Sequence, residues 1–267
     1  MIRILSLGAG VQSSTLALKI AHGELPMVDC GIFADTGAEP VGVYHWLDWL
    51  ETQLPFPVHR VMHKAGLLDN LTRSMHGDGR FATAPFYTAA GGGRGGSLRR
   101  QCTREFKVEP ITRKLREIVG LKKRQRAGTD IRVVQLIGIS FDEAHRMRPN
   151  REPWIRNEWP LVEARISRRD CLVWMKAHGY PEPTKSACTF CPYHNDAHWR
   201  DMKQDDPRSW TQAVEVDRLI RDGVPGTTHR LYLHRSLKPL EDVDFRNAED
   251  FGQLDAFGNE CEGLCGV

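Results

Sequence analysis

The stretch that decides the fold is Ser6-Leu7-Gly8-Ala9-Gly10-Val11-Gln12-Ser13-Ser14, between an apolar run at 2–7 and a helical pattern at 13–22. Glycines at 8 and 10 predict a tight turn that exposes successive backbone N–H groups. The hydroxyls of Ser13 and Ser14 fall at the electropositive first turn of the helix, so the stretch is predicted to bind an anion. It lacks the Gly-Lys-Ser/Thr ending of a Walker A loop and the third spaced glycine of a dinucleotide fingerprint. A purely structural strand-to-helix turn is the alternative.

Strand and helix patterns alternate along the chain after this turn. The apolar runs that predict strands lie at 2–7, 28–34, 58–62 and 131–139. The helical patterns lie at 13–22, 41–54, 66–74, 103–119, 167–178 and 207–221. Their alternation predicts the α/β class, with a parallel sheet flanked by helices in a Rossmann-like arrangement.

The chain is expected to divide into two parts. An α/β domain at 1–160 carries the anion site, and a mainly helical extension at 161–267 carries a Cys-x-x-Cys motif and a cysteine-bearing tail. Residues 77–96 are rich in glycine and have no apolar period, so they predict a mobile loop.

The composition is that of a globular protein. Of 267 residues, 40% are hydrophobic and 27% are charged, and the mean hydropathy is −0.44. No apolar run approaches the roughly 20 residues of a membrane span, and the N-terminus has no pattern of a secretory leader. We therefore expect a cytoplasmic protein without a membrane anchor, whose seven cysteines are reduced or bound to metal.

Positive charge concentrates at 94–132. This region holds 13 Lys and Arg against 4 Asp and Glu, a local charge of +9 in a chain whose net charge is +3. Such a region suits a polyanion, either a nucleic acid or the phosphates of a nucleotide. A solvated basic helix face is the alternative interpretation.

The turn resembles the phosphate loop of the adenine-nucleotide alpha-hydrolase-like superfamily, which includes the PP-loop ATP pyrophosphatases and the phosphoadenosine-phosphosulfate (PAPS) reductases. The PP-loop pattern Ser-Gly-Gly-x-Asp-Ser falls on residues 8–13, and the reductase variant Ser-x-Gly-Ala falls on residues 6–9. Two later stretches continue the resemblance in family order: Asp35-Thr36-Gly37-Ala38-Glu39 and Gly138-Ile139-Ser140-Phe141-Asp142-Glu143-Ala144-His145-Arg146.

The resemblance implies that 1–160 is an adenine-nucleotide-binding domain that takes ATP with Mg²⁺, or another adenine nucleotide. The residues that it assigns to the nucleotide are Ser6, Gly8, Ala9, Gly10, Gln12, Ser13, Ser14, Asp35, Thr36, Arg100 and Gly138. Gln12 stands where the ATP pyrophosphatases carry an acidic residue, and an amide is a poorer Mg²⁺ ligand than a carboxylate. Two structural alternatives remain: Asp35 capping the next helix, and Arg146 pairing with Glu143 at the surface.

Cysteines gather in three stretches. Cys188-Thr189-Phe190-Cys191 places two thiols on one tight turn, a geometry that suits a metal or an Fe–S cluster. The stretch around Cys102 resembles the segment that, with a later Cys-x-x-Cys, holds a [4Fe–4S] cluster in adenylyl-sulfate reductases and in DNA-sulfur-modification relatives. The tail adds Cys261 and Cys265, and it loosely resembles the C-terminal Glu-Cys-Gly-Leu-His of sulfonucleotide reductases, without the histidine.

We therefore expect a [4Fe–4S] cluster on Cys102, Cys188, Cys191 and Cys265, which leaves Cys261 for thiolate or persulfide chemistry. The reverse assignment of the two tail cysteines stays open. A structural Zn²⁺ site made by the two C-terminal pairs, with Cys102 left over, is the alternative. A bare redox dithiol at 188–191 is a further possibility.

The function that these features predict is ATP-dependent sulfur transfer. An acceptor oxygen in tRNA or DNA, bound through 94–132, is adenylated with release of pyrophosphate, and sulfur then displaces AMP. Arg146, with Arg99 or Arg100, neutralises the leaving group, and a protein such as a cysteine desulfurase supplies the sulfur. Two alternatives stay open: reduction of PAPS or adenylyl sulfate by a C-terminal cysteine, and a non-enzymatic nucleotide- or redox-sensing module.

Overall fold

The computed structural model describes residues 1–78, 80–81, 84–89, 95–227 and 229–246. Its central sheet has five strands in the order β3-β2-β1-β6-β7, and every neighbouring pair is parallel. The strands are β1 (Ile2–Ser6), β2 (Cys30–Asp35), β3 (Val58–Met62), β6 (Val133–Ile137) and β7 (Ile155–Glu158). The predicted α/β class, with a parallel sheet flanked by helices, is confirmed.

The strand order places a switch point at the centre of the sheet. From β1 the chain adds β2 and β3 on one side, and it then returns to add β6 and β7 on the other. In open parallel sheets, ligands bind beyond the carboxyl ends of the strands at this kind of reversal. The ends of β1 and β6 are therefore the expected place for a site.

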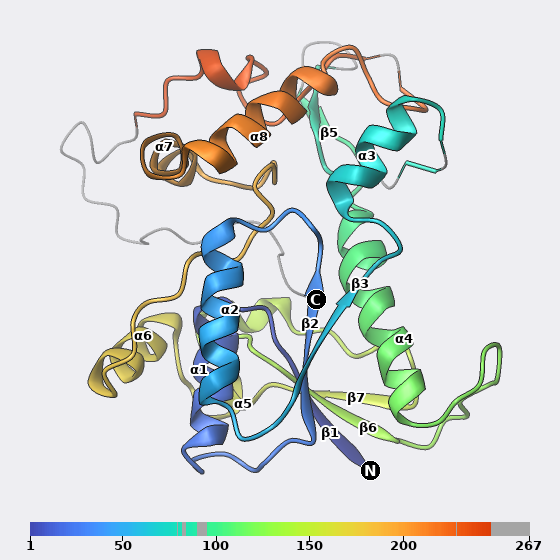
Figure 1. Ribbon diagram of the computed structural model, residues 1–267, viewed down its shortest axis with the longest axis vertical. Coiled ribbons are helices and arrows are strands. Elements are labelled where there is room, and N and C mark those ends of the chain that lie inside the picture. The colour runs from blue at the N-terminus through green and yellow to red at the C-terminus, as the bar shows by residue number, and fades with distance from the viewer. Residues whose placement is uncertain (79, 82–83, 90–94, 228, 247–267) are drawn as a thin grey trace.

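Helices cover both faces of the sheet (Figure 1). On one face α1 (Val11–Ala21), α2 (Val41–Gln53) and α6 (Arg168–Ala177) share a core with the sheet, and the short α5 (Pro160–Glu163) lies beside them. On the other face α4 (Glu109–Ile118) packs Leu115 against Ile4 and Ile32. Apolar residues of β1 and β2 alternate between these two cores, as the period of a strand requires.

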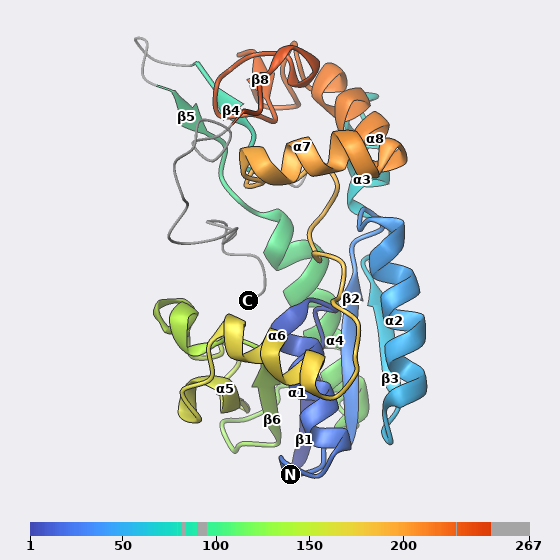
Figure 2. The same ribbon diagram turned by 90° about the vertical axis from the view of Figure 1, so that its left-hand side faces the viewer.

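A second group of elements lies beyond the carboxyl edge of the sheet (Figure 2). It contains α3 (Leu67–Met75), α7 (Asp196–Asp205), α8 (Pro207–Leu219) and a small antiparallel sheet of β4 (Tyr87–Thr88), β5 (Gly96–Ser97) and β8 (Leu231–Tyr232). Phe86, Phe106, Phe190 and Trp199 fill its core. The short helices η1 (Arg104–Val108), η2 (Phe141–Arg146) and η3 (Leu240–Asp242) connect larger elements.

Several elements differ from the sequence prediction, and α7, β5 and β8 were not predicted. The helix expected at 103–119 begins with a π-helical segment, η1, before α4. Within the expected loop at 77–96, β4 pairs with β8, which lies far along the chain. β7 carries Arg156 and Glu158, so its sequence gave no apolar run that marks a strand.

Within the described residues, the structure contains no helix of the length and apolar character that a membrane span requires.

Candidate functional site

The turn between β1 and α1 is held by hydrogen bonds of a serine side chain and contains one residue in a left-handed backbone conformation. The N–H of Gly8 donates to Oγ of Ser13 at 3.1 Å, and this hydroxyl donates to the carbonyl of Gly10 at 3.3 Å. Ala9 adopts a φ of 55°, a left-handed conformation that glycine usually supplies, whereas Gly8 and Gly10 do not. No side chain caps the N-terminus of α1, so its first N–H groups remain available to an anion.

The end of β6 packs directly against this turn. A Cβ atom on Gly138 would lie 2.7 Å from Cα and 2.8 Å from the backbone nitrogen of Ser13. Only glycine permits this approach, which fixes the turn at the switch point between β1 and β6.

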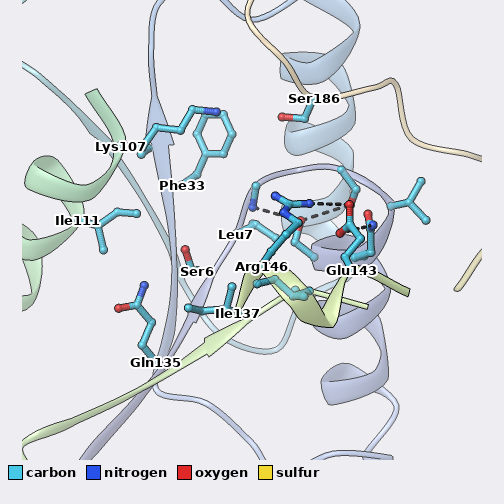
Figure 3. Close-up of a pocket in the computed structure, with 18 of the residues that line it drawn as sticks. Ser6, Leu7, Phe33, Lys107, Ile111, Gln135, Ile137, Glu143, Arg146 and Ser186 are labelled. Atoms are coloured by element: carbon cyan, nitrogen blue, oxygen red, sulfur yellow. Dashed lines mark hydrogen bonds and ion pairs between the residues drawn. The ribbon is translucent and has the colours of Figure 1, made fainter. Parts of the chain in front are cut away.

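A cavity of about 230 Å³ opens at this place (Figure 3). The turn, the end of β6, η2, the start of α4 and the segment 185–187 line it. Four cationic side chains contribute to its wall: Lys107, Arg146, Arg168 and Lys185. Cations beside an uncapped helix N-terminus make a wall that suits phosphate groups. We refer to this cavity as the nucleotide pocket.

Gln12, Glu143 and Arg146 form a linked group in the nucleotide pocket. The amide nitrogen of Gln12 donates to Oε2 of Glu143 at 3.1 Å, and Arg146 pairs with Oε1 of the same carboxylate at 2.5 Å. The side chains of Arg146 and Glu143 are only 11% and 18% exposed, so this pair is not a surface ion pair. An acidic residue at position 12 would repel Glu143, which gives a physical reason for the amide.

A second, smaller cavity of about 40 Å³ lies beside the nucleotide pocket. Three cysteines line it: Cys102, Cys188 and Cys191. Burial and the nearby Glu39 raise the pKa of the Cys188 thiol to about 12. Among the described residues, no three His, Cys, Asp or Glu side chains are arranged closely enough to hold a metal ion. We refer to this cavity as the cysteine pocket.

Glu39 joins the two pockets. Its carboxylate is 1% exposed and accepts hydrogen bonds from Thr36 at 3.2 Å and from Ser186 at 3.4 Å. Lys107 lies 3.4 Å from the same carboxylate and lines both pockets. In Figure 3 the amino group of Lys107 points across the mouth of the nucleotide pocket, toward Ser186. One buried carboxylate therefore ties three separate stretches of the chain together.

The predicted site residues fall into four groups. The nucleotide pocket is lined by Ser6, Gly8, Gly10, Gln12, Ser13, Gly138 and Arg146. The cysteine pocket is lined by Thr36, Arg100, Cys102, Cys188 and Cys191. Ala9, Ser14 and Asp35 line neither pocket. Cys261 and Cys265 lie outside the described residues. These assignments stay predictions.

Two of these residues have structural contacts. Oγ of Ser14 accepts a hydrogen bond from the indole of Trp46 at 2.9 Å, inside the core. Asp35 accepts hydrogen bonds from the N–H of Gly37 at 2.7 Å and from the hydroxyl of Tyr44 at 2.8 Å, and burial raises the pKa of Tyr44. Asp35 thus holds the end of β2 in place.

The sequence interpretation assigned no role to Glu39, Lys107, Lys185 or Gln135. Lys107 lies five residues after Cys102, and Lys185 lies three residues before Cys188. Gln135 carried its own signal, because it is a polar residue within the apolar run of β6.

Much of the positive charge at 94–132 has structural partners. Arg113 donates to the carbonyl of Met62 at 2.7 Å, and Arg116 donates to that of Gln125 at 2.5 Å. Arg104 pairs with Glu109 at 3.2 Å. The exposed cations at 122–132 precede β6, at the opposite edge of the sheet from the nucleotide pocket.

No family model and no curated protein sequence matches the chain. Among solved structures, the chain is similar to a phosphoadenylyl-sulfate (PAPS) reductase from Candida auris in a phosphate complex. The two are 12% identical, with a TM-score of 0.46, over 70% of this chain and 81% of the reductase. This likeness is one of fold, and the contacts within the two pockets carry the proposal that follows.

Proposed function

We propose that the chain is an ATP-dependent sulfurtransferase that adenylates an acceptor and then delivers sulfur to it. One observation carries the proposal. A pocket built for phosphates adjoins a pocket lined by three cysteines, and Lys107 lines both. This arrangement supports a function in which nucleotide activation and sulfur chemistry take place next to each other. Perturbed, buried polar groups beside a cavity are typical of functional sites.

In the first half-reaction the acceptor oxygen attacks the α-phosphorus of ATP, and the bond to pyrophosphate breaks. The backbone N–H groups of the turn would stabilise the developing phosphate charge, and Arg146 would stabilise the leaving pyrophosphate. Glu143 holds Arg146 in the wall of the pocket. Asp142 also lines the pocket, and carboxylate oxygens are the ligands that Mg²⁺ prefers.

Three cysteines around one small cavity support the proposal of an Fe–S cluster, which would require these side chains to move closer together, because within the described residues they do not form a metal-binding group. Three thiols face one cavity, and thiolates are the ligands of Fe–S clusters. Cys102, Cys188 and Cys191 would hold three irons of a [4Fe–4S] cluster, and Cys265 would supply the fourth ligand. Such a cluster, with cysteine on all four irons, would supply electron transfer and would leave no open iron for sulfur. Cys261 would receive the sulfur as a persulfide from a donor such as a cysteine desulfurase. The outer sulfur would displace AMP from the adenylated acceptor, and a thiol reductant would then cleave the disulfide between Cys261 and the acceptor, which leaves the sulfur on the acceptor.

We propose that tRNA or DNA is the acceptor. The exposed cations Lys122, Lys123, Arg124, Arg126 and Arg132 support this choice, because they form a basic edge suited to a phosphate backbone.

A reductive function is the second candidate. Gln12 directs its amide nitrogen to Glu143, which favours a nucleotide that is bound without metal at position 12. Reduction of PAPS by Cys261 would use the same pocket without cleaving ATP.

The products formed from ATP test the proposed function. Protein purified without oxygen is incubated with ATP, Mg²⁺ and either total tRNA or duplex DNA. We expect AMP and pyrophosphate in equal amounts, and only when the acceptor is present. Arg146→Met is expected to lower this turnover about 100-fold, because it removes the charge that stabilises the leaving group.

The matched control is Arg156→Met on β7, since the Arg156 side chain is 52% exposed and pairs with Glu158. Full turnover in this variant would show that the loss is specific to the pocket. Formation of ADP and phosphate would contradict attack at the α-phosphorus.

A further inference from the structure

One polar side chain that lines the nucleotide pocket, on the sheet side of the turn, takes no part in the reaction proposed above. Gln135 is part of β6, between Val134 and Leu136, and it is only 8% exposed. It lines the nucleotide pocket from the sheet side. Burying an amide is unfavourable unless its polar atoms find partners.

The orientation of the Gln135 amide is fixed by a chain of hydrogen bonds that ends on the backbone. Nδ2 of Asn157 donates to the carbonyl of Arg148 at 3.1 Å, so its oxygen is the acceptor for Asn150. The N–H of Glu152 donates to Oδ1 of Asn150 at 3.0 Å, so Asn150 presents its nitrogen as the donor. That nitrogen bonds Oε1 of Gln135 at 3.4 Å. Only one assignment of oxygen and nitrogen in the three side-chain amides gives a partner to both the carbonyl of Arg148 and the N–H of Glu152.

The consequence is that Gln135 turns its N–H groups toward the cavity. In Figure 3 its amide nitrogen points into the space between Ser6 and Ile111. This nitrogen has no hydrogen-bond partner among the residues that the structure describes. A donor on a side chain this deeply buried is satisfied when the pocket contains an acceptor.

We propose that Gln135 determines base specificity by donating a hydrogen bond to a ring nitrogen of adenine. This inference rests on the proposed nucleotide site. Gln135 pairs in register with Ile4, four residues before Gly8, a separation of about 13 Å along the strand. A nucleotide with its phosphates at the turn therefore lies along the sheet with its base near Gln135. Ile111 and Ile137 provide apolar walls for a flat ring.

Binding of modified nucleotides to variants tests this role. Calorimetry compares the wild type with Gln135→Leu and Gln135→Glu, using ATP, 2′-deoxy-ATP and the 1-, 3- and 7-deaza analogues of ATP. We expect the wild type to bind one deaza analogue about tenfold more weakly than ATP, the usual magnitude for one lost hydrogen bond. Gln135→Leu should bind ATP about tenfold more weakly and no longer distinguish that analogue. Gln135→Glu should bind ATP more weakly still.

The outcomes separate this inference from the proposed function. If Gln135→Leu binds ATP as the wild type does, or if it still discriminates the same analogue, the inference is wrong while the nucleotide site stands. A variant that no longer distinguishes 2′-deoxy-ATP from ATP, but still distinguishes the deaza analogues from ATP, would place Gln135 at the ribose. That result also overturns the inference. A wild-type chain that binds no adenine nucleotide contradicts the proposed function, and the inference fails with it. Thermal unfolding of each variant confirms that it is folded.

Discussion

Replacing Gly138 with alanine is expected to lower the affinity for ATP more than tenfold. The new Cβ would lie 2.7 Å from Cα of Ser13 and 3.1 Å from the carbonyl carbon of Gln12, and both are backbone atoms that cannot rotate away. Overpacking of this kind costs about 2 kcal/mol in the free energy of unfolding when the structure adjusts around it. The adjustment here moves the turn, so the affinity for ATP should fall more than tenfold. Calorimetry and thermal unfolding measure the two effects.

The control for this variant is Gly96→Ala. A Cβ at Gly96 in β5 meets its nearest neighbour, a methyl group of Thr88, at 4.0 Å, which is ordinary contact. This variant should bind ATP as the wild type does. Wild-type affinity in Gly138→Ala would show that the turn does not bind the nucleotide.

The α/β fold could be predicted from the sequence because its signals are local. Apolar runs marked β1, β2, β3 and β6, and the glycine-containing turn marked the start of α1. The charged strand β7 had no such signal, because its pairing with β6 depends on the completed sheet. The small sheet of β4, β5 and β8 was missed for the same reason, since its strands are two residues long and β8 lies far from the other two in sequence.

The sequence motifs predicted which stretches of the chain form the candidate site, but not which residues contact one another there. The motifs indicated the turn, the region of Gly138 and the cysteines, and the structure brings Cys102 together with Cys188 and Cys191. The sequence could not indicate that Ala9 takes the left-handed conformation. It also could not indicate the role of Glu39, whose partner Ser186 is 147 residues away. Long-range partners of this kind are set by tertiary packing.

Replacing Cys188 with alanine is expected to remove bound iron completely. Cys188 is partly buried and lines the cysteine pocket, where the hydroxyl of Thr36 lies 3.4 Å from its sulfur. A cluster held by thiolates does not survive the loss of a ligand that nothing else can replace. Because burial raises the pKa of this thiol to about 12, cluster assembly must displace its proton, so assembly should become less favourable as the pH falls. Iron and sulfide analysis after anaerobic purification measures the result.

The matched control is Cys171→Ala. Cys171 is fully buried in α6 and lines neither pocket, so this variant should retain wild-type iron. Zinc in place of iron in the wild type would overturn the cluster assignment while leaving Cys188 as a ligand. Iron at the wild-type level in Cys188→Ala would contradict the role of Cys188 itself.

The most direct test of the central claim is transfer of labelled sulfur. Anaerobically purified protein is supplied with a cysteine desulfurase, cysteine labelled in its sulfur, a thiol reductant, and tRNA or duplex DNA, with and without ATP. The account predicts that label enters the nucleic acid only when ATP is present, together with one AMP for each sulfur transferred. Sulfite released from PAPS in the presence of thioredoxin, with no ATP turnover and no labelled nucleic acid, would contradict it.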